Sequence, residues 1–263
     1  MTNQFHEANR RRWDAGSESW ARRADLSGTW RECHRNPSLA LHDAELRWFG
    51  DVAGKNVAVL GSGDNKVVFA LSGMGAKVTS IDISWQQLIV ARHRAAELGL
   101  HVEFVQADVV DMSMFNDAVY DVVYTGGHVA HWVSDLNRYY AEAARILKPK
   151  GLLIVKEYHP IRHMWHPFLN LSRVSSNCLH QGVNYFERGP YRSEVAPEVL
   201  PVMPGGLEQF IFHWTVADYI TAISSSGCKL IHLEEFDDSQ ESWETTPLAG
   251  LPASILFIGR RCG

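Results

Sequence analysis

A pair of glycines directly after an apolar run is the first pattern in the chain that could do chemistry. The segment VAVLGSGDN spans residues 57–65 and carries Gly61, Ser62 and Gly63, and an apolar-periodic stretch follows at 67–74. Glycine has no Cβ, so the backbone can turn sharply and press against a ligand while the next helix presents unpaired N–H groups. This order predicts a ligand-binding loop between a strand and a helix, although the same pattern also occurs in turns that only connect elements.

Asp82 is the second candidate, because it follows an apolar run and lies twenty-one residues beyond Gly61. A carboxylate at the end of the strand KVTSI (77–81) can accept hydrogen bonds from both ribose hydroxyls of an adenosine-containing cofactor. The alternative is an N-cap for the helix expected at 84–98, a role that Asp82 or Ser84 could take. The spacing and the strand-end position favour the ribose role. Two neighbours complete this part of the expected site: Ile83 and Gln87.

Two further strand ends carry residues suited to the same ligand. Asp108 follows the next strand candidate, and its carboxylate can accept from an exocyclic adenine amine while Val109 packs on the base. Thr125 and Gly126 begin an open glycine loop after the strand candidate 119–124. In open α/β sheets, ligands bind beyond the carboxyl ends of the strands, so these successive strand ends predict one shared site.

The elements that position these residues alternate between short apolar runs and longer amphipathic stretches. The strand candidates are β-branched or aromatic runs bounded by turn residues: 57–60, 77–81, 102–105, 119–124, 151–156, 228–236 and 254–260. The helix candidates place apolar residues at helical spacing: 67–74, 84–98, 134–147 and 214–226. The alternation predicts an α/β fold whose parallel sheet has helices on both faces.

Two stretches depart from this alternation. Residues 1–50 have polar helical patterning with tryptophans and an arginine cluster, which predicts an N-terminal helical cap. Prolines and glycines interrupt residues 160–210 too often for a simple βα connection, so we expect a lid or substrate insert there. Its aromatic side chains would line an acceptor site or form the core of the insert itself. The cap therefore precedes one domain, 51–263, that contains the insert.

Composition excludes several classes of protein. The 263 residues carry 25 Lys and Arg against 30 Asp and Glu, and the net charge of −5 gives little non-specific attraction for nucleic acid. The four cysteines are far apart and form no paired metal-binding or disulfide motif. The start has no apolar leader, and no run approaches the roughly 20 apolar residues of a membrane span. We expect a cytoplasmic protein with neither a nucleic-acid nor a membrane partner; its oligomeric state stays open.

Together, residues 55–158 resemble the class I S-adenosylmethionine-dependent methyltransferases, particularly their small-molecule branch, type 11. VLGSGDN is similar to the family's glycine motif, VTSIDIS to its ribose motif, QADVVDM to its adenine motif, YDVVYTGG to its fourth motif and RILKPKGLLIV to the elements that follow. The resemblance implies a Rossmann-like, seven-stranded, mostly parallel sheet with an antiparallel last strand at 254–260 and S-adenosyl-L-methionine as cofactor. Chain order and resemblance also place Trp20, His34 or one of Arg22, Arg23 and Arg31 near the methionine end, although the arginines could instead form a solvated face.

One position departs from the family pattern. The family often has an acidic residue two positions before the first glycine, where this chain has Val59, so the methionine amine needs another partner. NAD is the alternative cofactor, but its fingerprint needs a third glycine where this chain has Lys66, and no second mononucleotide half follows. The sequence therefore favours an adenosylmethionine site.

Methyl transfer from a sulfonium is an in-line substitution that needs orientation, exclusion of water and often a base for a hydroxyl or amine. The candidate bases are His128, His159 and His213, which lie near the expected rim of the sheet. A histidine can accept a proton at neutral pH, but each of these could instead cap a helix or satisfy a local backbone group. No metal is expected at His159, His163 and His166, because no carboxylate stands nearby at ligand spacing.

The whole pattern predicts an enzyme, an S-adenosylmethionine-dependent methyltransferase that acts on a hydroxyl or amine of a small-molecule acceptor. The alternatives are an RNA or protein methyltransferase and a non-catalytic adenosylmethionine-binding protein. The lack of basic excess and of a recognisable RNA-binding module argues against an RNA substrate.

Overall fold

A seven-stranded sheet forms the centre of the computed structural model, which describes residues 3–63, 66–165, 184–194, 207–237 and 250–263. The strand order is β3-β2-β1-β4-β5-β9-β8. The strands are β1 (Asn56–Leu60), β2 (Lys77–Asp82), β3 (Val102–Gln106), β4 (Tyr120–Thr125), β5 (Leu147–Tyr158), β8 (Cys228–Phe236) and β9 (Ser254–Arg261). β1 to β5 pair in parallel, whereas β9 runs antiparallel to both of its neighbours. The α/β class and the Rossmann-like sheet with an antiparallel last strand are thus confirmed.

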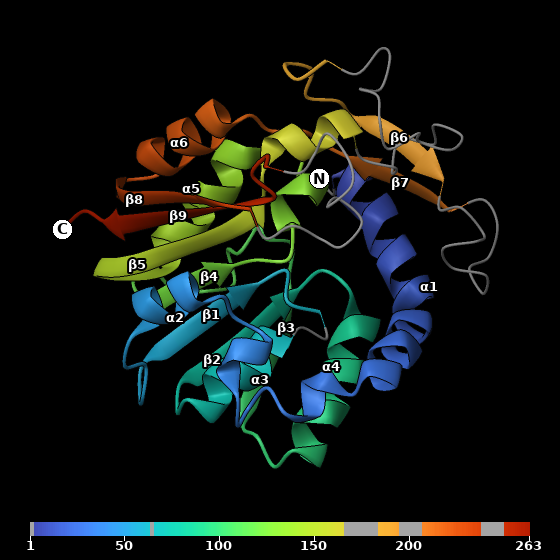
Figure 1. Ribbon diagram of the computed structural model, residues 1–263, viewed down its shortest axis with the longest axis vertical. Coiled ribbons are helices and arrows are strands. Elements are labelled where there is room, and N and C mark those ends of the chain that lie inside the picture. The colour runs from blue at the N-terminus through green and yellow to red at the C-terminus, as the bar shows by residue number, and fades with distance from the viewer. Residues whose placement is uncertain (1–2, 64–65, 166–183, 195–206, 238–249) are drawn as a thin grey trace.

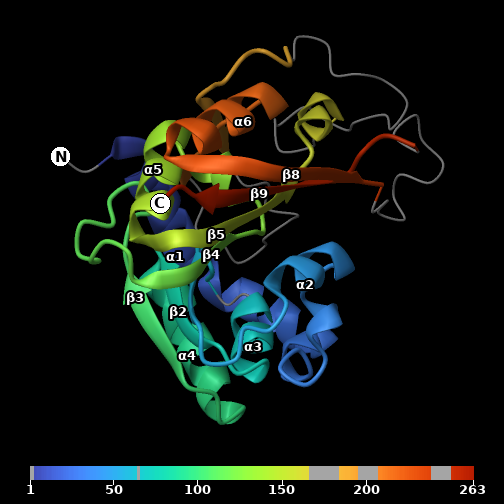
Figure 2. The same cartoon turned by 90° about the vertical axis from the view of Figure 1, so that its left-hand side faces the viewer.

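Helices cover both faces of the sheet (Figures 1 and 2). They are α1 (Gln4–Ser27), α2 (Asp43–Phe49), α3 (Lys66–Gly73), α4 (Trp85–Glu97), α5 (Leu136–Ile146) and α6 (Val216–Ser225), with short 3-10 turns η1 (Thr29–Arg31), η2 (Pro37–Leu39), η3 (Val129–Trp132) and η4 (Pro160–Trp165). Val57 and Val59 of β1 belong to the core under α2 and α3, whereas Ala58 and Leu60 belong to the core under α5 and α6. Two cores result because successive side chains of a strand point to opposite faces.

Local side chains decide where two of these helices begin. Ser84 is the N-cap of α4, and its hydroxyl accepts the Gln87 N–H at 3.2 Å. Thr215 and Asp218 form a reciprocal capping box at the start of α6. Because Ser84 satisfies the helix end, the carboxylate of Asp82 does not act as the cap of α4.

The predicted strands and helices are confirmed with small shifts of their ends, and the largest shift is at the start of β5. The sequence predicted this strand from Gly151, but it begins at Leu147, which pairs with Tyr120 before a register shift in β4. Pro149 explains the early start, because a residue before proline avoids the helical region and the helix has to stop. The longer β5 carries the chain as far as Tyr158 at the rim of the sheet.

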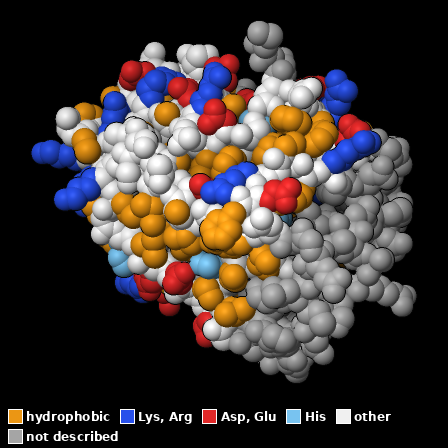
Figure 3. All heavy atoms as spheres, turned by 90° about the horizontal axis from the view of Figure 1, so that it is seen from above, with side chains coloured by type: hydrophobic (Ala, Val, Ile, Leu, Met, Phe, Trp, Pro, Cys, Tyr) orange, Lys and Arg blue, Asp and Glu red, His pale blue; other side chains and the backbone are white. Residues whose placement is uncertain are grey.

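The N-terminal segment and the predicted insert meet at one side of the sheet. α1 contacts both α4 and the small antiparallel sheet of β6 (Tyr191–Glu194) and β7 (Glu208–Ile211), as Figure 1 shows. The two strands lie within the predicted insert, whose residues 166–183 and 195–206 lie outside the described part of the chain. On the face seen from above, apolar side chains gather in the middle with charged side chains around them (Figure 3). No helix among the described residues is long and apolar enough to cross a membrane.

Candidate active site: two adjoining pockets

The carboxyl ends of β1 and β2 hold the glycine loop against Asp82. Gly63 N–H donates to Asp82 Oδ2 at 2.8 Å, and Ser84 N–H donates to Oδ1 at 2.8 Å. Ser62 lies deeper, with its hydroxyl oxygen 2.5 Å from that of Ser80. The two backbone donors fix the orientation of the carboxylate, and each carboxylate oxygen can accept more than one hydrogen bond. Asp82 can therefore hold the loop and bind a ligand hydroxyl at the same time.

Gly61 and Gly63 shape the loop in different ways. Both have a positive φ, +62° and +48°, which L side chains rarely adopt. A Cβ at Gly61 would also lie 2.5 Å from Cγ2 of Val129, so that position is closed to any larger residue. At Gly63 the nearest atoms to a Cβ belong to Gln87 and Asp82, at 3.6 and 3.7 Å. A side chain at either position would enter the space between the loop and its neighbours.

Asp108 is bound from two directions. Its Oδ1 accepts the Val110 N–H at 3.1 Å, and its Oδ2 lies 2.7 Å from Nδ1 of His6 on α1. Ser134 N–H donates to His6 Nε2 at 2.9 Å, so the imidazole hydrogen lies on Nδ1 and is donated to Asp108. The carboxylate predicted to receive an adenine amine therefore also anchors the first helix.

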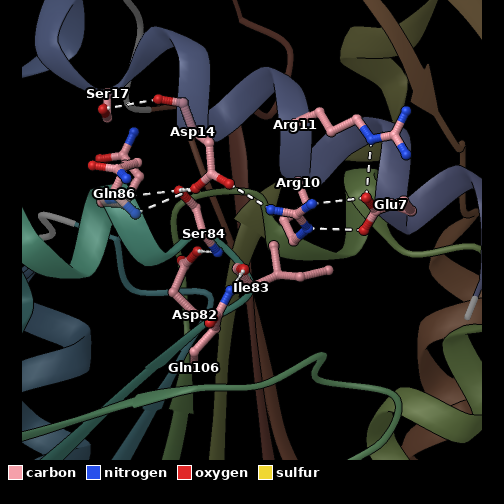
Figure 4. Close-up of polar contacts among 11 residues, drawn as sticks. Glu7, Arg10, Arg11, Asp14, Ser17, Asp82, Ile83, Ser84, Gln86 and Gln106 are labelled. Atoms are coloured by element: carbon pink, nitrogen blue, oxygen red, sulfur yellow. Dashed lines mark hydrogen bonds and ion pairs between the residues drawn. The ribbon is translucent and has the colours of Figure 1, made fainter.

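A second anchor holds the middle of α1 at the start of α4 (Figure 4). Ser84 Oγ donates to Asp14 Oδ1 at 2.7 Å, and the Gln86 N–H reaches the same oxygen at 3.2 Å. Nη1 of Arg10 lies 2.6 Å from Oδ2 of Asp14. Arg10 also binds Glu7, and this hydrogen bond lowers the pKa of the Glu7 carboxyl to about 2. These contacts hold the helix across the ends of the strands.

A cavity of about 570 Å³, which we name the larger pocket, lies between the glycine loop, α1 and the strand ends. This volume is typical of small-molecule sites. Two polar atoms of its lining residues, Trp20 Nε1 and Gln87 Oε1, are buried and have no hydrogen-bond partner within the described ranges. Leaving buried polar atoms unpaired costs free energy, so both atoms suit a ligand with a donor and acceptor edge. Together with the carboxylates, they fit an adenosine-type cofactor.

The structure brings most of the predicted cofactor residues together around the larger pocket: Trp20, Gly61, Ser62, Gly63, Asp82, Ile83, Gln87, Asp108 and Val109. Thr125 and Gly126 are not among the lining residues. Thr125 is fully buried with its hydroxyl bound to Tyr139, and Gly126 packs closely against the Tyr124 ring. Gly127, the next residue, lines the pocket in their place.

Arg23, one of the arginines expected near the methionine end, lines the larger pocket, but two further positive side chains on this wall were not expected from the sequence. Arg94 and Lys66 both line the larger pocket; Arg94 pairs with Asp25 at 3.0 Å, whereas Lys66 forms no ion pair with a described residue. The sequence drew attention to Lys66 only as the residue that breaks the NAD fingerprint. Val59, the position of the missing acidic residue, is fully buried in the core and cannot contact a ligand. A cation next to the glycine loop was therefore the signal to look for.

A second cavity of about 150 Å³, which we name the smaller pocket, adjoins the larger one. Its lining residues are Trp13, Gly127, His128, His131, Trp132, Glu157, Tyr158, His159, Pro160, Arg162, His163, His213, Trp214 and Tyr219. Trp13, Gly127 and Trp132 line both pockets. The guanidinium carbon of Arg12 lies 4.3 and 4.9 Å from the Trp13 and Trp132 ring centres, and burial lowers the pKa of Arg12 to about 10, so it stays charged. Trp13, Gly127 and Trp132 therefore form the wall between the two pockets.

All three predicted catalytic histidines line the smaller pocket, but their ring nitrogens differ in availability. His159 Nδ1 already accepts the Ile161 N–H at 3.1 Å, and its Nε2 lies 2.8 Å from Glu235 Oε1. His213 Nε2 is buried without a hydrogen-bond partner among the described residues, and burial lowers the pKa of His213 to about 4. The His128 ring stacks on Tyr158. A role for these histidines as bases stays a prediction.

Glu157 is the residue of the smaller pocket that sequence analysis overlooked. It is 2% exposed, and its Oε1 accepts the Ala130 N–H at 3.2 Å. Burial raises the pKa of its carboxyl to about 8. A signal for it was available, because Leu153, Val155 and Glu157 alternate along β5 and the first two face the core under α5 and α6. Glu157 continues that inward face to the rim of the sheet.

Comparisons with known proteins find methyltransferases among the relatives of this chain. The family model described as "Methyltransferase domain" matches residues 59–155. The uncharacterized methyltransferase YbaJ of Bacillus subtilis is 34% identical over 46% of this chain and 47% of its own length. The ubiquinone biosynthesis O-methyltransferase of Salmonella paratyphi A is 33% identical over 48% of this chain and 52% of its own length. The chain thus spans about half the length of the curated relatives it matches.

Solved structures agree over most of the chain. An S-adenosylmethionine-dependent methyltransferase from Mesorhizobium loti superposes with a TM-score of 0.60 at 22% identity, covering 83% of this chain and 96% of its own. A putative S-adenosylmethionine-dependent methyltransferase from Listeria monocytogenes reaches a TM-score of 0.63 at 22% identity, covering 84% and 97%. The class I fold expected from the motifs is therefore confirmed.

Proposed function

We propose that the protein is an enzyme that transfers a methyl group from S-adenosyl-L-methionine to a small molecule. The match of residues 59–155 to a methyltransferase domain supports this proposal. The observation that carries this proposal is the shared wall of Trp13, Gly127 and Trp132 between the two pockets. A donor in the larger pocket and an acceptor in the smaller one would meet at that wall. Two substrates of a substitution reaction need such contact.

The larger pocket supplies partners for each part of the cofactor. Asp82 suits the ribose hydroxyls, because two backbone N–H groups already hold its carboxylate in place. Asp108 and Val109 suit the adenine. Lys66 suits the methionine carboxylate, because its ammonium has no other ion-pair partner among the residues the structure describes. Val59 leaves the methionine amine to polar groups of the loop.

Bound S-adenosylmethionine supplies a methyl group on a positively charged sulfur. The chain's own contribution is to orient the acceptor and to keep water out. The rings of Trp13 and Trp132 and the helix α1 cover the junction of the pockets, held by the anchors at Asp108 and Asp14. Because the reaction creates no strong charge on the protein, positioning accounts for most of the expected rate.

The smaller pocket supports a compact, planar acceptor with a hydroxyl group. Its walls carry the aromatic rings of Tyr158, Trp214 and Tyr219. Burial lowers the pKa of His131 to about 3 and that of His213 to about 4, so both histidines are neutral at pH 7. Two neutral histidines and the positive side chain of Arg162 on these walls favour an uncharged hydroxyl over an ammonium, whose burial needs a paired negative charge. Oxygen methylation also agrees with the name of the Salmonella relative.

Thermal unfolding of the purified protein tests the cofactor proposal. The ligands are S-adenosylmethionine, S-adenosylhomocysteine and NADH, each well above its expected dissociation constant. A ligand at 100 times its dissociation constant stabilises the native state by about 2.7 kcal/mol, which gives a clear rise in melting temperature. We expect a rise with both adenosyl ligands and none with NADH. A rise with NADH alone would contradict the proposal.

Turnover separates the enzyme from a protein that only binds the cofactor. We expect release of S-adenosylhomocysteine when small phenols are added together with S-adenosylmethionine, measured by mass spectrometry. Binding without release on a broad panel of hydroxyl, amine and carboxylate acceptors would instead identify a non-catalytic binding protein.

A further inference from the structure

The carboxyl of Glu157 combines deep burial with an oxygen that has no protein partner. Oε1 accepts the Ala130 N–H at 3.2 Å, and the side chain is 2% exposed. Within the described part of the chain, no donor binds the second oxygen, Oε2, although Glu157 lines the smaller pocket. A buried carboxyl with a free oxygen is costly unless a ligand pairs with it. The smaller pocket therefore contains a hydrogen-bonding position without a protein partner.

Several titratable groups face Glu157 from the elements packed around it. From η3, β5, η4 and the segment before α6 they are His128, His131, Tyr158, His159, Arg162, His163 and His213; from β4, α5 and α6 they are Tyr124, Tyr139, Tyr140 and Tyr219. The charge of Glu157 adds to burial in raising the pKa of these four tyrosines. The tyrosines therefore stay neutral and are weak competitors for a proton. Burial lowers the pKa of His131 to about 3 and that of His213 to about 4, so both histidines are neutral at pH 7.

We propose that Glu157 is a catalytic residue of the methyl transfer, whose free carboxylate oxygen binds the acceptor's hydroxyl and takes its proton. This inference rests on the proposed function and adds a proton acceptor to the three predicted histidines. His159 has its accepting nitrogen occupied by the Ile161 N–H, whereas Oε2 of Glu157 is open to the pocket. Position, burial and a free oxygen thus select the carboxyl.

The step balances as follows. The acceptor's O–H bond breaks and its proton moves to Glu157, while the acceptor oxygen forms a bond to the methyl carbon. The carbon–sulfur bond breaks, and its electron pair stays on sulfur as a neutral thioether. Glu157 then releases the proton to solvent before the next turnover. Because burial raises the pKa of this carboxyl to about 8, a larger fraction of the enzyme is active as the pH rises toward that value.

The test compares wild type with Glu157→Gln, which keeps the shape of the side chain and removes the proton acceptor. S-adenosylhomocysteine affinity is measured by calorimetry, and transfer is measured on a panel of phenols with benzylamines as amine counterparts. We expect equal affinity in both proteins and a loss of at least about 100-fold in kcat on phenols, the usual size of a general-base effect. The wild-type rate should rise about tenfold per pH unit below pH 8, and this dependence should be absent from the variant. Glu103→Gln, whose carboxylate accepts a hydrogen bond from Thr79 in the sheet, is the matched control.

The outcomes separate the two claims. If wild type does not bind S-adenosylhomocysteine, the proposed function fails and this inference fails with it. If it binds, but Glu157→Gln keeps the wild-type kcat and pH profile, only the role of Glu157 is overturned. Transfer to benzylamines alone, or to neither class, also overturns that role, because a proton acceptor for a hydroxyl would then have no substrate.

Two further measurements hold if Glu157→Gln folds poorly. Glu157→Asp keeps a carboxyl but shortens it, so we expect a reduced kcat that still rises with pH. The stability of wild type itself gives an independent readout. A carboxyl whose folded pKa is raised to about 8 from 4.5 stabilises the fold fully below pH 4.5, and that contribution is lost as pH rises to 8. The melting temperature of wild type should therefore fall as pH rises from 6.5 to 8, above the range in which the buried His131 and His213 change stability; a melting temperature that does not fall across this range would contradict the assignment.

Discussion

The larger and the smaller pocket are built from the same sheet but by different means. The larger pocket depends on backbone N–H groups and strand-end carboxylates, as in the pair of bonds from Gly63 and Ser84 to Asp82. The smaller pocket depends on buried side chains that come from α1, η3, β5, η4 and the start of α6. Backbone geometry tolerates few ligands, whereas a set of side chains can change with little effect on the fold. Under the proposed function, donor binding would depend on the backbone of the fold, while acceptor choice would depend on the side chains of this chain.

Removing the carboxylate of Asp82 should produce the largest effect on the larger pocket. We expect Asp82→Ala to weaken S-adenosylhomocysteine binding by at least about 100-fold, because hydrogen bonds to a charged group contribute roughly 1.5 to 3 kcal/mol each. Calorimetry measures the affinity. Asp51→Asn, in a surface loop, is the control and should bind as wild type does. Normal binding by Asp82→Ala would show that the ribose lies elsewhere.

In the smaller pocket, the buried His213 should instead affect how the free energy of unfolding depends on pH under acidic conditions. Burial lowers the pKa of His213 from 6.5 to about 4, so the unfolded chain binds the proton more tightly. The contribution of neutral His213 to the free energy of unfolding is therefore fully present above pH 6.5. It is lost as pH falls toward 4, by roughly 3 kcal/mol in all. The free energy of unfolding of His213→Gln, measured with denaturant, should therefore fall less steeply between pH 6.5 and 4 than that of wild type. Parallel curves would mean that His213 is already solvated in the folded state.

Lys66 offers a sharper test within the larger pocket. We expect Lys66→Ala to bind S-adenosylhomocysteine about tenfold more weakly, a change of 1.4 kcal/mol. Its affinity for 5′-methylthioadenosine, which has no amino-acid end, should not change. Calorimetry with both ligands separates a direct contact from general damage to the loop. An equal loss with both ligands would remove the assignment of Lys66 to the methionine carboxylate.

The smallest effect is expected at the anchor of α1 on α4. Asp14→Ala removes the acceptor of the two hydrogen bonds from α4, donated by Ser84 and Gln86, each of which contributes about 1 kcal/mol, together with the contact of Arg10 within α1. Stopped-flow fluorescence should show S-adenosylhomocysteine leaving several-fold faster, because the helix covers the larger pocket. Glu18→Ala lies on the same helix and pairs only with Arg22 among the described residues. Equal dissociation rates in the two variants would mean that α1 does not retain the ligand.

Most residues predicted to bind the cofactor line the larger pocket, because they follow local rules of sequence. A strand, a glycine turn and a strand-end carboxylate are short patterns, and parallel pairing of β1 with β2 then brings Gly63 to Asp82. Thr125 and Gly126 failed as lining residues, because the chain turns one residue later, at Gly127. That turn depends on packing against Tyr124 and Tyr139, which no local pattern reveals.

The smaller pocket was predicted less completely for the opposite reason. The three histidines were placed at the rim correctly, but their usefulness as bases depends on tertiary partners, such as the Ile161 N–H that occupies His159. Glu157 was not predicted, because its suitability as a base depends on burial, which raises the pKa of its carboxyl. Burial of a polar side chain is set by segments distant in the sequence, here the turn at Ala130.

A crystal structure of the protein with S-adenosylhomocysteine tests the central claim most directly. We expect the ribose hydroxyls on Asp82, the adenine beside Val109 and the sulfur at the shared wall that contains Gly127. A ligand bound with its sulfur away from that wall, or bound outside the larger pocket, would contradict the assignment of donor and acceptor to adjoining pockets.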